Sequence, residues 1–231
     1  MIEIEPSELQ RKIAEELAKL PPEPKEVPYS FTYPEVRDII IATVSLIGAF
    51  SIALMGGFYI FILWDLDTFL LTLELSAIGV ITAFISHELA HKFVAQRYGF
   101  KAHFQLWVYG IIMAFVTAFL GFLFAAPGAV YIEGRGATTK QIGRISIAGA
   151  ITNLSIAGSF LIIFLLTAGF IQSLAFFVMF LNGFLAFFNL LPIAPLDGFG
   201  VYQWNKKVLI MLLAIALTIV IFGEIYVYVW I

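Results

Sequence analysis

The chain has 231 residues, of which 61% are hydrophobic and 13% are charged, and its formal net charge is −3. An ordinary soluble domain carries about 25% charged residues, so this composition excludes that class and indicates a polytopic membrane protein. The small negative net charge gives no sign of a nucleic-acid partner. Because the sequence has no cysteine, disulfides and Cys-ligated metals are excluded, and His, Asp and Glu remain as candidate ligands.

The first 36 residues are expected to form a cytoplasmic segment that precedes a membrane-embedded domain at 37–231. Residues 7–20 have the apolar spacing of a short amphipathic helix, with Ser7 as a candidate N-cap. Four prolines between residues 21 and 28 then predict a stiff, extended linker. The apolar face of the helix can lie on the membrane, dock on the protein or bind a partner, and the sequence leaves these options open.

Five apolar segments are long enough to cross a bilayer, which takes about 20 residues in a helix. They are residues 39–63, 75–98, 142–171, 174–191 and 208–231. A further apolar segment follows the second of them. The sequence therefore predicts an all-α polytopic membrane protein with about five to six transmembrane helices.

The pentapeptide His87-Glu88-Leu89-Ala90-His91 lies inside the second of these segments. Helix residues four apart lie on one face with Cβ atoms about 5–6 Å apart, so both imidazoles can bind one metal ion. The glutamate between them can act as a general base toward a metal-bound water. Since ionisable groups inside a membrane are costly and usually functional, the motif predicts a zinc site rather than an exposed polar helix face.

Asp197 is the candidate third ligand, because catalytic zinc has three protein ligands and leaves one position for water. Pro192 and Pro195 precede it and cannot continue a regular helix, and Gly198 permits an unusual backbone. We therefore expect the fourth span to unwind and to free Asp197 to reach the metal. Asn189, on the preceding turn, is a candidate donor to the oxyanion that forms on the scissile carbonyl.

The apolar segment near residues 104–133 is predicted to enter the membrane and return to the same side. If it crossed fully, Asp197 would emerge on the opposite side from His87 and His91, and the three could not share a metal. We expect an inserted helix followed by a returning extended stretch at 127–132. The edge of that stretch can pair with an unwound substrate by strand addition or simply with a neighbouring segment, and both interpretations stay open.

With this topology the basic residues gather on one side of the membrane. They are Lys92, Arg97, Lys101, Arg135, Lys140, Arg144, Lys206 and Lys207. The loop at 65–74 on the other side contains neither lysine nor arginine. This is the pattern of the positive-inside rule, which predicts a multi-pass cell-membrane protein with its N-terminus and active-site mouth facing the cytoplasm.

The motifs together resemble the site-two protease family of intramembrane zinc metalloproteases, of archaeal or bacterial type. His-Glu-x-x-His on a membrane span is followed by Asn-x-x-Pro-x-x-x-Leu-Asp-Gly at 189–198. A third family element, Gly-Pro-x-x-Asn, corresponds to Gly149–Asn153, with Ala150 in place of proline. The resemblance covers residues 77–200, and only the family core is expected, without the PDZ or CBS domains of some members.

The resemblance implies one zinc ion held by His87, His91 and Asp197. It implies that Glu88 activates the water, while Asn189 positions the substrate or stabilises the tetrahedral intermediate. The implied reaction is regulated intramembrane proteolysis, in which peptide bonds are hydrolysed within or next to transmembrane segments. The expected partners are the lipid bilayer and single-span membrane protein substrates.

A membrane metal-ion carrier that uses the same ligands is the alternative function. A carrier is expected to have polar or ionisable pairs along a path on both sides of the membrane midplane. The predicted outer half of this chain has no such pairs, and Glu88 has no evident role in transport. The sequence therefore favours the protease.

Overall fold

The computed structural model describes residues 29–61, 65–133 and 136–230. The predicted amphipathic helix at 7–20 and its linker lie outside these residues. Arg135, one of the basic residues assigned to the cytoplasmic side, lies outside them as well.

The protein is a multi-pass membrane protein, because five helical stretches of the described chain are long and apolar enough to cross a bilayer. They are α2 (Tyr33–Leu54), the continuous stretch Leu66–Arg97, α6 (Thr139–Leu166), α7 (Gly169–Asn189) and α9 (Lys206–Trp230). The second stretch consists of α3 (Leu66–Val80), a π-helical turn η2 (Ile81–Ile85) and α4 (Ser86–Arg97). The predicted all-α polytopic fold class is confirmed.

The helix boundaries differ from the predicted ones where caps and glycines decide them. Helix α2 begins at Tyr33 rather than at residue 39, because Thr32 and Glu35 form a capping box. It ends at Leu54 rather than at residue 63, because Gly56 and Gly57 follow with φ of 84° and 66°. A short 3₁₀ helix, η1 (Gly57–Phe61), comes next.

Two other predicted boundaries were wrong for similar reasons. Asp65, expected in a loop, caps α3 by accepting a hydrogen bond from the Thr68 amide, so the second span begins well before residue 75. The third span stops at Leu166 instead of residue 171, and α7 begins at Gly169, whose φ is 65°.

The segment near residues 104–133 leaves one end of the helix bundle and returns to it, as predicted. Strands β1 (Lys101–Leu106) and β2 (Gly128–Glu133) pair antiparallel, with Leu106 opposite Gly128. Between them, α5 (Val108–Phe119) is about 18 Å long, short of the roughly 30 Å hydrocarbon core. The Trp107 amide donates to the Pro127 carbonyl over 2.8 Å, so both ends of the insertion lie side by side.

Strand β1 was missed by the sequence prediction, which placed extended structure only after the inserted helix. Because β1 occupies one edge of β2, pairing with a neighbouring segment is established for that edge. In the part of the chain that the structure describes, no third strand pairs with the other edge of β2. Pairing of β2 with a neighbouring segment therefore leaves its other edge for strand addition by a substrate, and the two interpretations are compatible.

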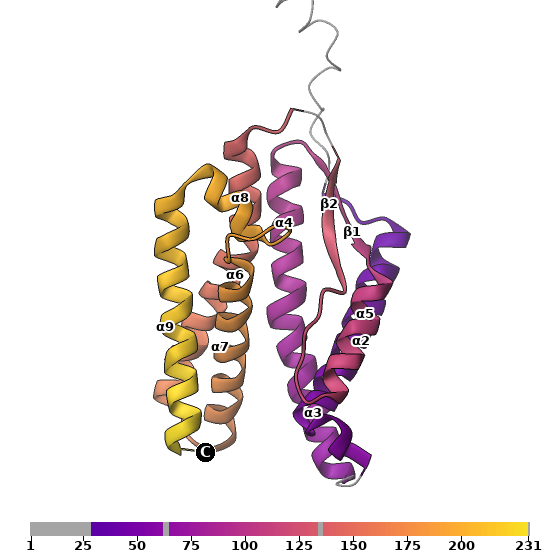
Figure 1. The fold of residues 1–231 in the computed structure, drawn as a ribbon, viewed down its shortest axis with the longest axis vertical. Coiled ribbons are helices and arrows are strands. Elements are labelled where there is room, and N and C mark those ends of the chain that lie inside the picture. Colours follow the sequence, from indigo (N-terminus) through magenta and orange to yellow (C-terminus); the bar gives the residue numbers. More distant parts are fainter. Residues whose placement is uncertain (1–28, 62–64, 134–135, 231) are drawn as a thin grey trace, which may run out of the picture.

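Helix α4 lies between two groups of elements (Figure 1). The sheet, α2 and α5 lie on one side, and α6, α7, α9 and the short helix α8 (Asp197–Trp204) lie on the other. Small residues allow close contacts within the second group: a Cβ on Gly143 would lie 2.3 Å from Trp204, and one on Gly183 would lie 2.4 Å from Ile219. The His-Glu-x-x-His motif on α4 is thus contacted from both sides.

The returning path of residues 107–127 can be tested by labelling single-cysteine variants in oriented vesicles. Lys101→Cys and Lys140→Cys, at the two flanks of the insertion, are expected to react with a membrane-impermeant maleimide from the same side. Asp67→Cys, at the opposite end of the bundle, serves as the control and is expected to react only from the other side. The native chain has no cysteine, so no background needs to be removed. Labelling of Lys101→Cys and Lys140→Cys from opposite sides would show a full crossing.

Candidate metal centre

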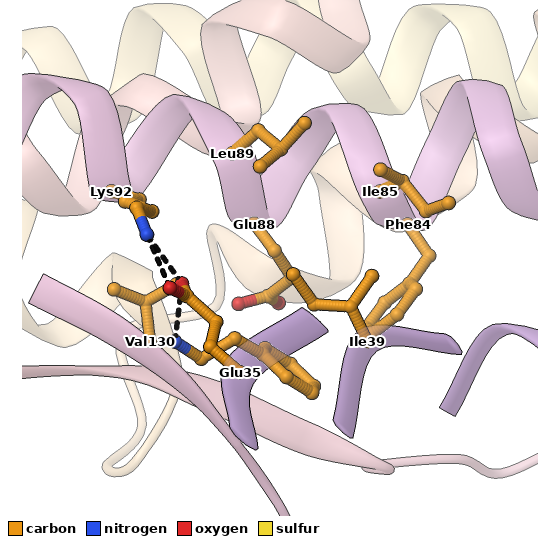
Figure 2. Close-up of a pocket in the computed structure, with 9 residues that line it drawn as sticks. Glu35, Ile39, Phe84, Ile85, Glu88, Leu89, Lys92 and Val130 are labelled. Atoms are coloured by element: carbon orange, nitrogen blue, oxygen red, sulfur yellow. Dashed lines mark hydrogen bonds and ion pairs between the residues drawn. The ribbon is translucent and has the colours of Figure 1, made fainter. Parts of the chain in front are cut away.

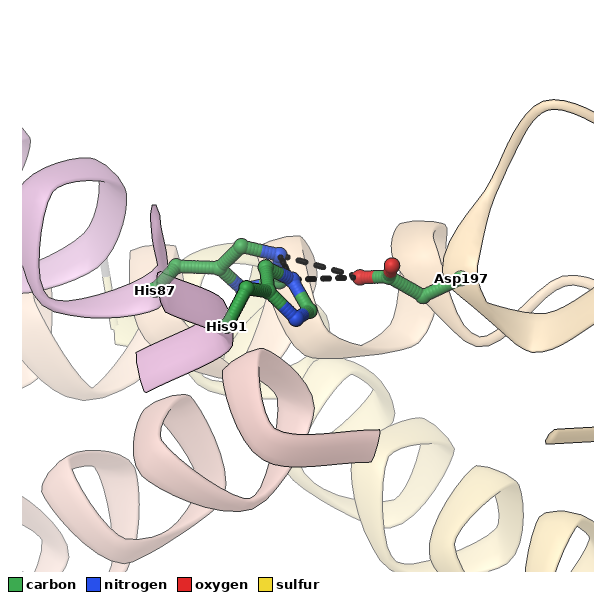
Figure 3. A group of neighbouring side chains, drawn as sticks. All are labelled: His87, His91 and Asp197. Carbon is green, nitrogen blue, oxygen red and sulfur yellow. Dashed lines mark hydrogen bonds and ion pairs between the residues drawn. The ribbon is translucent and has the colours of Figure 1, made fainter. Parts of the chain in front are cut away.

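His87 and His91 on α4 and Asp197 at the start of α8 meet at one point (Figure 3). The two Nε2 atoms lie 3.0 Å apart, and Oδ2 of Asp197 lies 3.1 Å from Nε2 of His87 and 3.0 Å from Nε2 of His91. Both histidines are buried and Asp197 is partly buried. The structure therefore brings together the three predicted ligands, although the aspartate is 110 residues from His87 in the chain.

Asp197 reaches this point because the chain leaves the helical path between α7 and α8. Helix α7 ends at Asn189, and Pro192 and Pro195 lie in the irregular turns that follow, as predicted. The expected reason for Gly198 was wrong, since its φ is not in the positive region. A Cβ at this position would lie 2.1 Å from the Leu190 carbonyl oxygen, so close approach of the backbone requires the glycine.

The other ring nitrogens of both histidines are held by oxygen acceptors. Nδ1 of His87 lies 2.5 Å from Oδ1 of Asn153, and Nδ1 of His91 lies 2.8 Å from the Ile145 carbonyl oxygen. The carbonyl of Ile145 can only accept, so Nδ1 of His91 donates. The Asn153 amide group donates elsewhere, so its oxygen accepts from Nδ1 of His87. Both Nε2 atoms are thereby left with their lone pairs toward Asp197.

Asn153 belongs to a buried polar network that joins three helical stretches. Its Nδ2 donates to the Ala83 carbonyl over 3.0 Å and to Oδ1 of Asn182 over 2.9 Å. Ala83 lies in the π-helical turn just before the motif, a type of irregularity that is often found at functional sites. The network orients Asn153 and, through it, the ring of His87.

Gly149 provides the room in which the His87 ring lies. A Cβ at this position would lie 2.5–2.6 Å from three atoms of that ring. Gly149 and Asn153, one turn apart on α6, therefore contact the same imidazole, one by close approach and the other by a hydrogen bond. Ala150, which stands where the family motif has proline, is fully buried in an apolar cluster.

The three donor atoms fit a metal ion. Two imidazole lone pairs and a carboxylate oxygen repel one another unless a cation lies between them. Tetrahedral zinc with bonds of about 2.0–2.1 Å places its ligands about 3.3 Å apart, close to the spacing observed here.

A cavity of about 490 Å³ opens onto these donors. Glu88, Asn189 and strand β2 line it together with the three donor residues. Nδ2 of Asn189 donates one hydrogen bond to the Leu185 carbonyl over 3.1 Å, so the side chain is bound to its own helix where it lines the cavity. The ring of His103, in β1, is stacked on that of Tyr131, and His103 is not among the residues that line this cavity.

Three contributors to the site were not assigned from the sequence: the Ile145 carbonyl, the Ala83 carbonyl and the close fit of Gly149. Every residue has a backbone carbonyl, so the sequence does not indicate which carbonyls bind at a site. The roles of the Ile145 and Ala83 carbonyls become visible only in the folded structure. Asn182, in contrast, was visible as a polar residue in an apolar span, and its contact with Asn153 gives it a place in the network.

Known proteins resemble a large part of this chain. It is 37% identical over 172 residues to "Putative zinc metalloprotease MJ0611" of Methanocaldococcus jannaschii, a match that covers 73% of this chain and 85% of that protein. It is 30% identical over 139 residues to "Putative zinc metalloprotease Rip3" of Mycobacterium tuberculosis, which covers 56% of this chain and 31% of that protein. No family model and no solved structure matches the chain.

The chain belongs to the site-two protease family of zinc metalloproteases. The curated relatives agree with the family that the motifs resemble, and the extent of the match to the archaeal protein decides the assignment.

The fit between Gly149 and the His87 ring predicts the effect of adding a methyl group. Gly149→Ala is expected to displace the imidazole and to lower zinc affinity by roughly 10- to 100-fold, the usual size of an effect on ligand orientation. Gly158→Ala is the matched control on the same helix, because a Cβ there meets nothing within 4 Å. Zinc affinity is measured by competition with a chelator. Equal affinities in the two variants would show that the ring does not depend on this contact.

Proposed function

We propose that this protein is an intramembrane zinc endopeptidase that hydrolyses peptide bonds within or next to the transmembrane segments of single-span membrane proteins. The observation that carries the proposal is the convergence of His87, His91 and Asp197 beside Glu88, in a cavity of a five-span helix bundle. One zinc ion per chain fits this donor set. When bound, zinc polarises a carbonyl oxygen and lowers the pKa of a coordinated water to about 7.

Glu88 is the general base in this proposal. It precedes the second ligand by three residues on α4 and lines the same cavity as the donor atoms. From this position its carboxylate accepts a proton from the attacking water and passes it to the leaving amine. Asn189 orients the substrate or donates to the oxyanion after it turns from Leu185 toward the cavity.

The free edge of β2 is the proposed docking site for an unwound substrate. The backbone of a transmembrane helix is bonded to itself, so it must open locally before a peptide bond can be attacked. Residues 128–132 of β2 line the cavity, and among the described residues no strand pairs with the edge of β2 opposite β1, which supports substrate pairing by strand addition. A neighbouring apolar cavity of about 140 Å³ shares Phe84 and Phe188 with the catalytic one and suits the membrane-embedded part of a substrate.

The active-site mouth is proposed to face the cytoplasm. The ends of α4, β1, α6 and α9 that lie on the same side of the bundle as α8 carry Arg97, Lys101, Lys140 and Lys206 (Figure 1). The opposite end carries Asp65 and Asp67 at the start of α3. This distribution supports a cytoplasmic location for the basic end.

A metal carrier with the same ligands is less well supported. Carriers need further polar sites along a path through the membrane. Within the described residues, one group of three or more His, Asp or Glu side chains has the geometry to hold a metal ion. A single group of this kind suits a protein that retains its metal ion better than one that moves the ion across the membrane.

The proposal is tested with the full chain purified in detergent and incubated with a single-span membrane protein. Glu88→Gln is expected to keep bound zinc and to lose cleavage by about 10²- to 10⁴-fold, because it removes the base but no metal ligand. Asp197→Ala is expected to lose both zinc and cleavage. Zinc is measured by elemental analysis and cleavage by mass spectrometry of the products.

The same variants separate the protease from the carrier. A parent protein that moves zinc into liposomes and cleaves no substrate, with transport unaltered in Glu88→Gln, would contradict the proposal.

A further inference from the structure

A fully buried ion pair lies next to the metal centre and is not part of the site described above (Figure 2). Nζ of Lys92, on α4, lies 2.6 and 2.5 Å from the two carboxylate oxygens of Glu35, on α2. Both side chains are 1% exposed, and Nζ also lies 3.9 Å from the centre of the Phe31 ring. Removal of two charges from water is costly enough that burial of such a pair is weak support for a role in stability alone.

The Glu35 carboxylate also holds the outer edge of strand β1. Its Oε1 accepts a hydrogen bond from the Phe104 amide over 3.0 Å. One turn along α2, Oδ2 of Asp38 accepts from the Leu106 amide over 3.2 Å. On the same edge, the Ala102 carbonyl accepts from Nε2 of Gln96 on α4. Side chains of α2 and α4 therefore occupy three of the backbone groups to which an added strand would bond on this edge.

This arrangement determines which edge of the sheet is open. Phe104 and Leu106 are paired with Val130 and Gly128. Because Phe104 and Leu106 direct their amides to α2, Val130 and Gly128 direct theirs away from β1, as antiparallel pairing requires. Both of these β2 residues line the catalytic cavity.

The ion pair and the catalytic base are close neighbours. Glu88 and Lys92 are one turn apart on α4, and both line a small cavity with Glu35, Phe104 and Val130 (Figure 2). The cross-strand pair Phe104 and Val130 thus borders the same small cavity as the ion pair and the base. A shift of the sheet relative to Glu35 would also move β2 relative to Glu88.

We propose that Glu35, Lys92 and Asp38 form a sheet clamp, a set of positioning residues for the proteolytic reaction. The clamp closes the edge of β1 and holds the open edge of β2 at a fixed register beside Glu88 and the metal ligands. It thereby determines which peptide bond of a strand-paired substrate reaches the metal. This inference rests on the proposed function for its consequence in catalysis, whereas the position of the sheet can be measured without a substrate.

Two double variants separate the positioning role from simple burial of charge. Glu35→Leu/Lys92→Met and Glu35→Gln/Lys92→Met both remove the two charges, but only the glutamine keeps an acceptor for the Phe104 amide. The leucine variant is expected to lower kcat by about tenfold or more and to shift the cleaved bond along the substrate. The glutamine variant is expected to cleave the parental bond with kcat within about threefold of the parent. Rates and cleavage positions are measured with the full chain and a single-span substrate.

Thr72→Val is the control for loss of a buried polar group far from the sheet, since the Thr72 hydroxyl donates only to its own helix at the Phe69 carbonyl. It is expected to cleave the parental bond at the parental rate. Bound zinc and the melting temperature are measured in all variants, so that unfolding is distinguished from mispositioning. If the leucine and glutamine variants cleave the same bond at the same rate, the clamp has no positioning role.

Hydrogen exchange of residues 101–106 provides a second readout that needs no substrate. The leucine variant is expected to exchange the Phe104 amide faster than the glutamine variant does, with α6 and α7 unchanged. Equal exchange in the two variants would overturn the clamp, even if the parent cleaves. Absence of cleavage by the parent would instead contradict the proposed function, and the exchange data would still decide whether the clamp holds the sheet.

Discussion

The structure depends on three acceptor atoms being held about 3 Å apart inside a membrane-spanning bundle. Two imidazole lone pairs and a carboxylate repel one another, and burial strengthens that repulsion. A cation among the donors relieves this repulsion, so we expect metal binding to stabilise the local fold. The hydrogen bonds to Nδ1 of both histidines maintain this orientation by directing the other nitrogen of each ring toward Asp197.

Much of the fold can be understood as the support for that convergence. Helix α4 carries two of the candidate ligands and the proposed base, and it is contacted by the sheet on one side and by α6 on the other. Glycine at position 149 lets α6 approach the first ligand, and the turns after α7 bring the third ligand in from the end of the bundle. The inserted segment 107–127 returns to its starting end, which places the free edge of β2 over the same cavity.

The sequence predicted those features that arise from residue type and spacing. The motif at 87–91 indicated one helix face, and the requirement that Asp197 share its depth predicted the returning path of residues 104–133. It could not predict features that arise from contacts between distant segments. Lys92 was predicted to be one of the basic residues on the cytoplasmic side, yet it is buried in an ion pair with Glu35. This pairing could not be predicted, because the two residues are 57 positions apart in the sequence and only the fold brings them together. Strand β1, in contrast, had a signal that was missed: its six residues alternate between polar and apolar types, which is typical of a half-buried strand.

Zinc K-edge X-ray absorption on the purified full-length chain tests the central claim most directly. The account predicts one zinc per chain, with two imidazole nitrogens at about 2.0–2.1 Å, an oxygen shell at about 2.0–2.2 Å and no sulfur. Replacement of Asp197 by alanine should leave the imidazole signal of any residual zinc and alter the oxygen shell. Zinc bound with one imidazole or none, or with a spectrum that does not change in the Asp197 variant, would contradict the account.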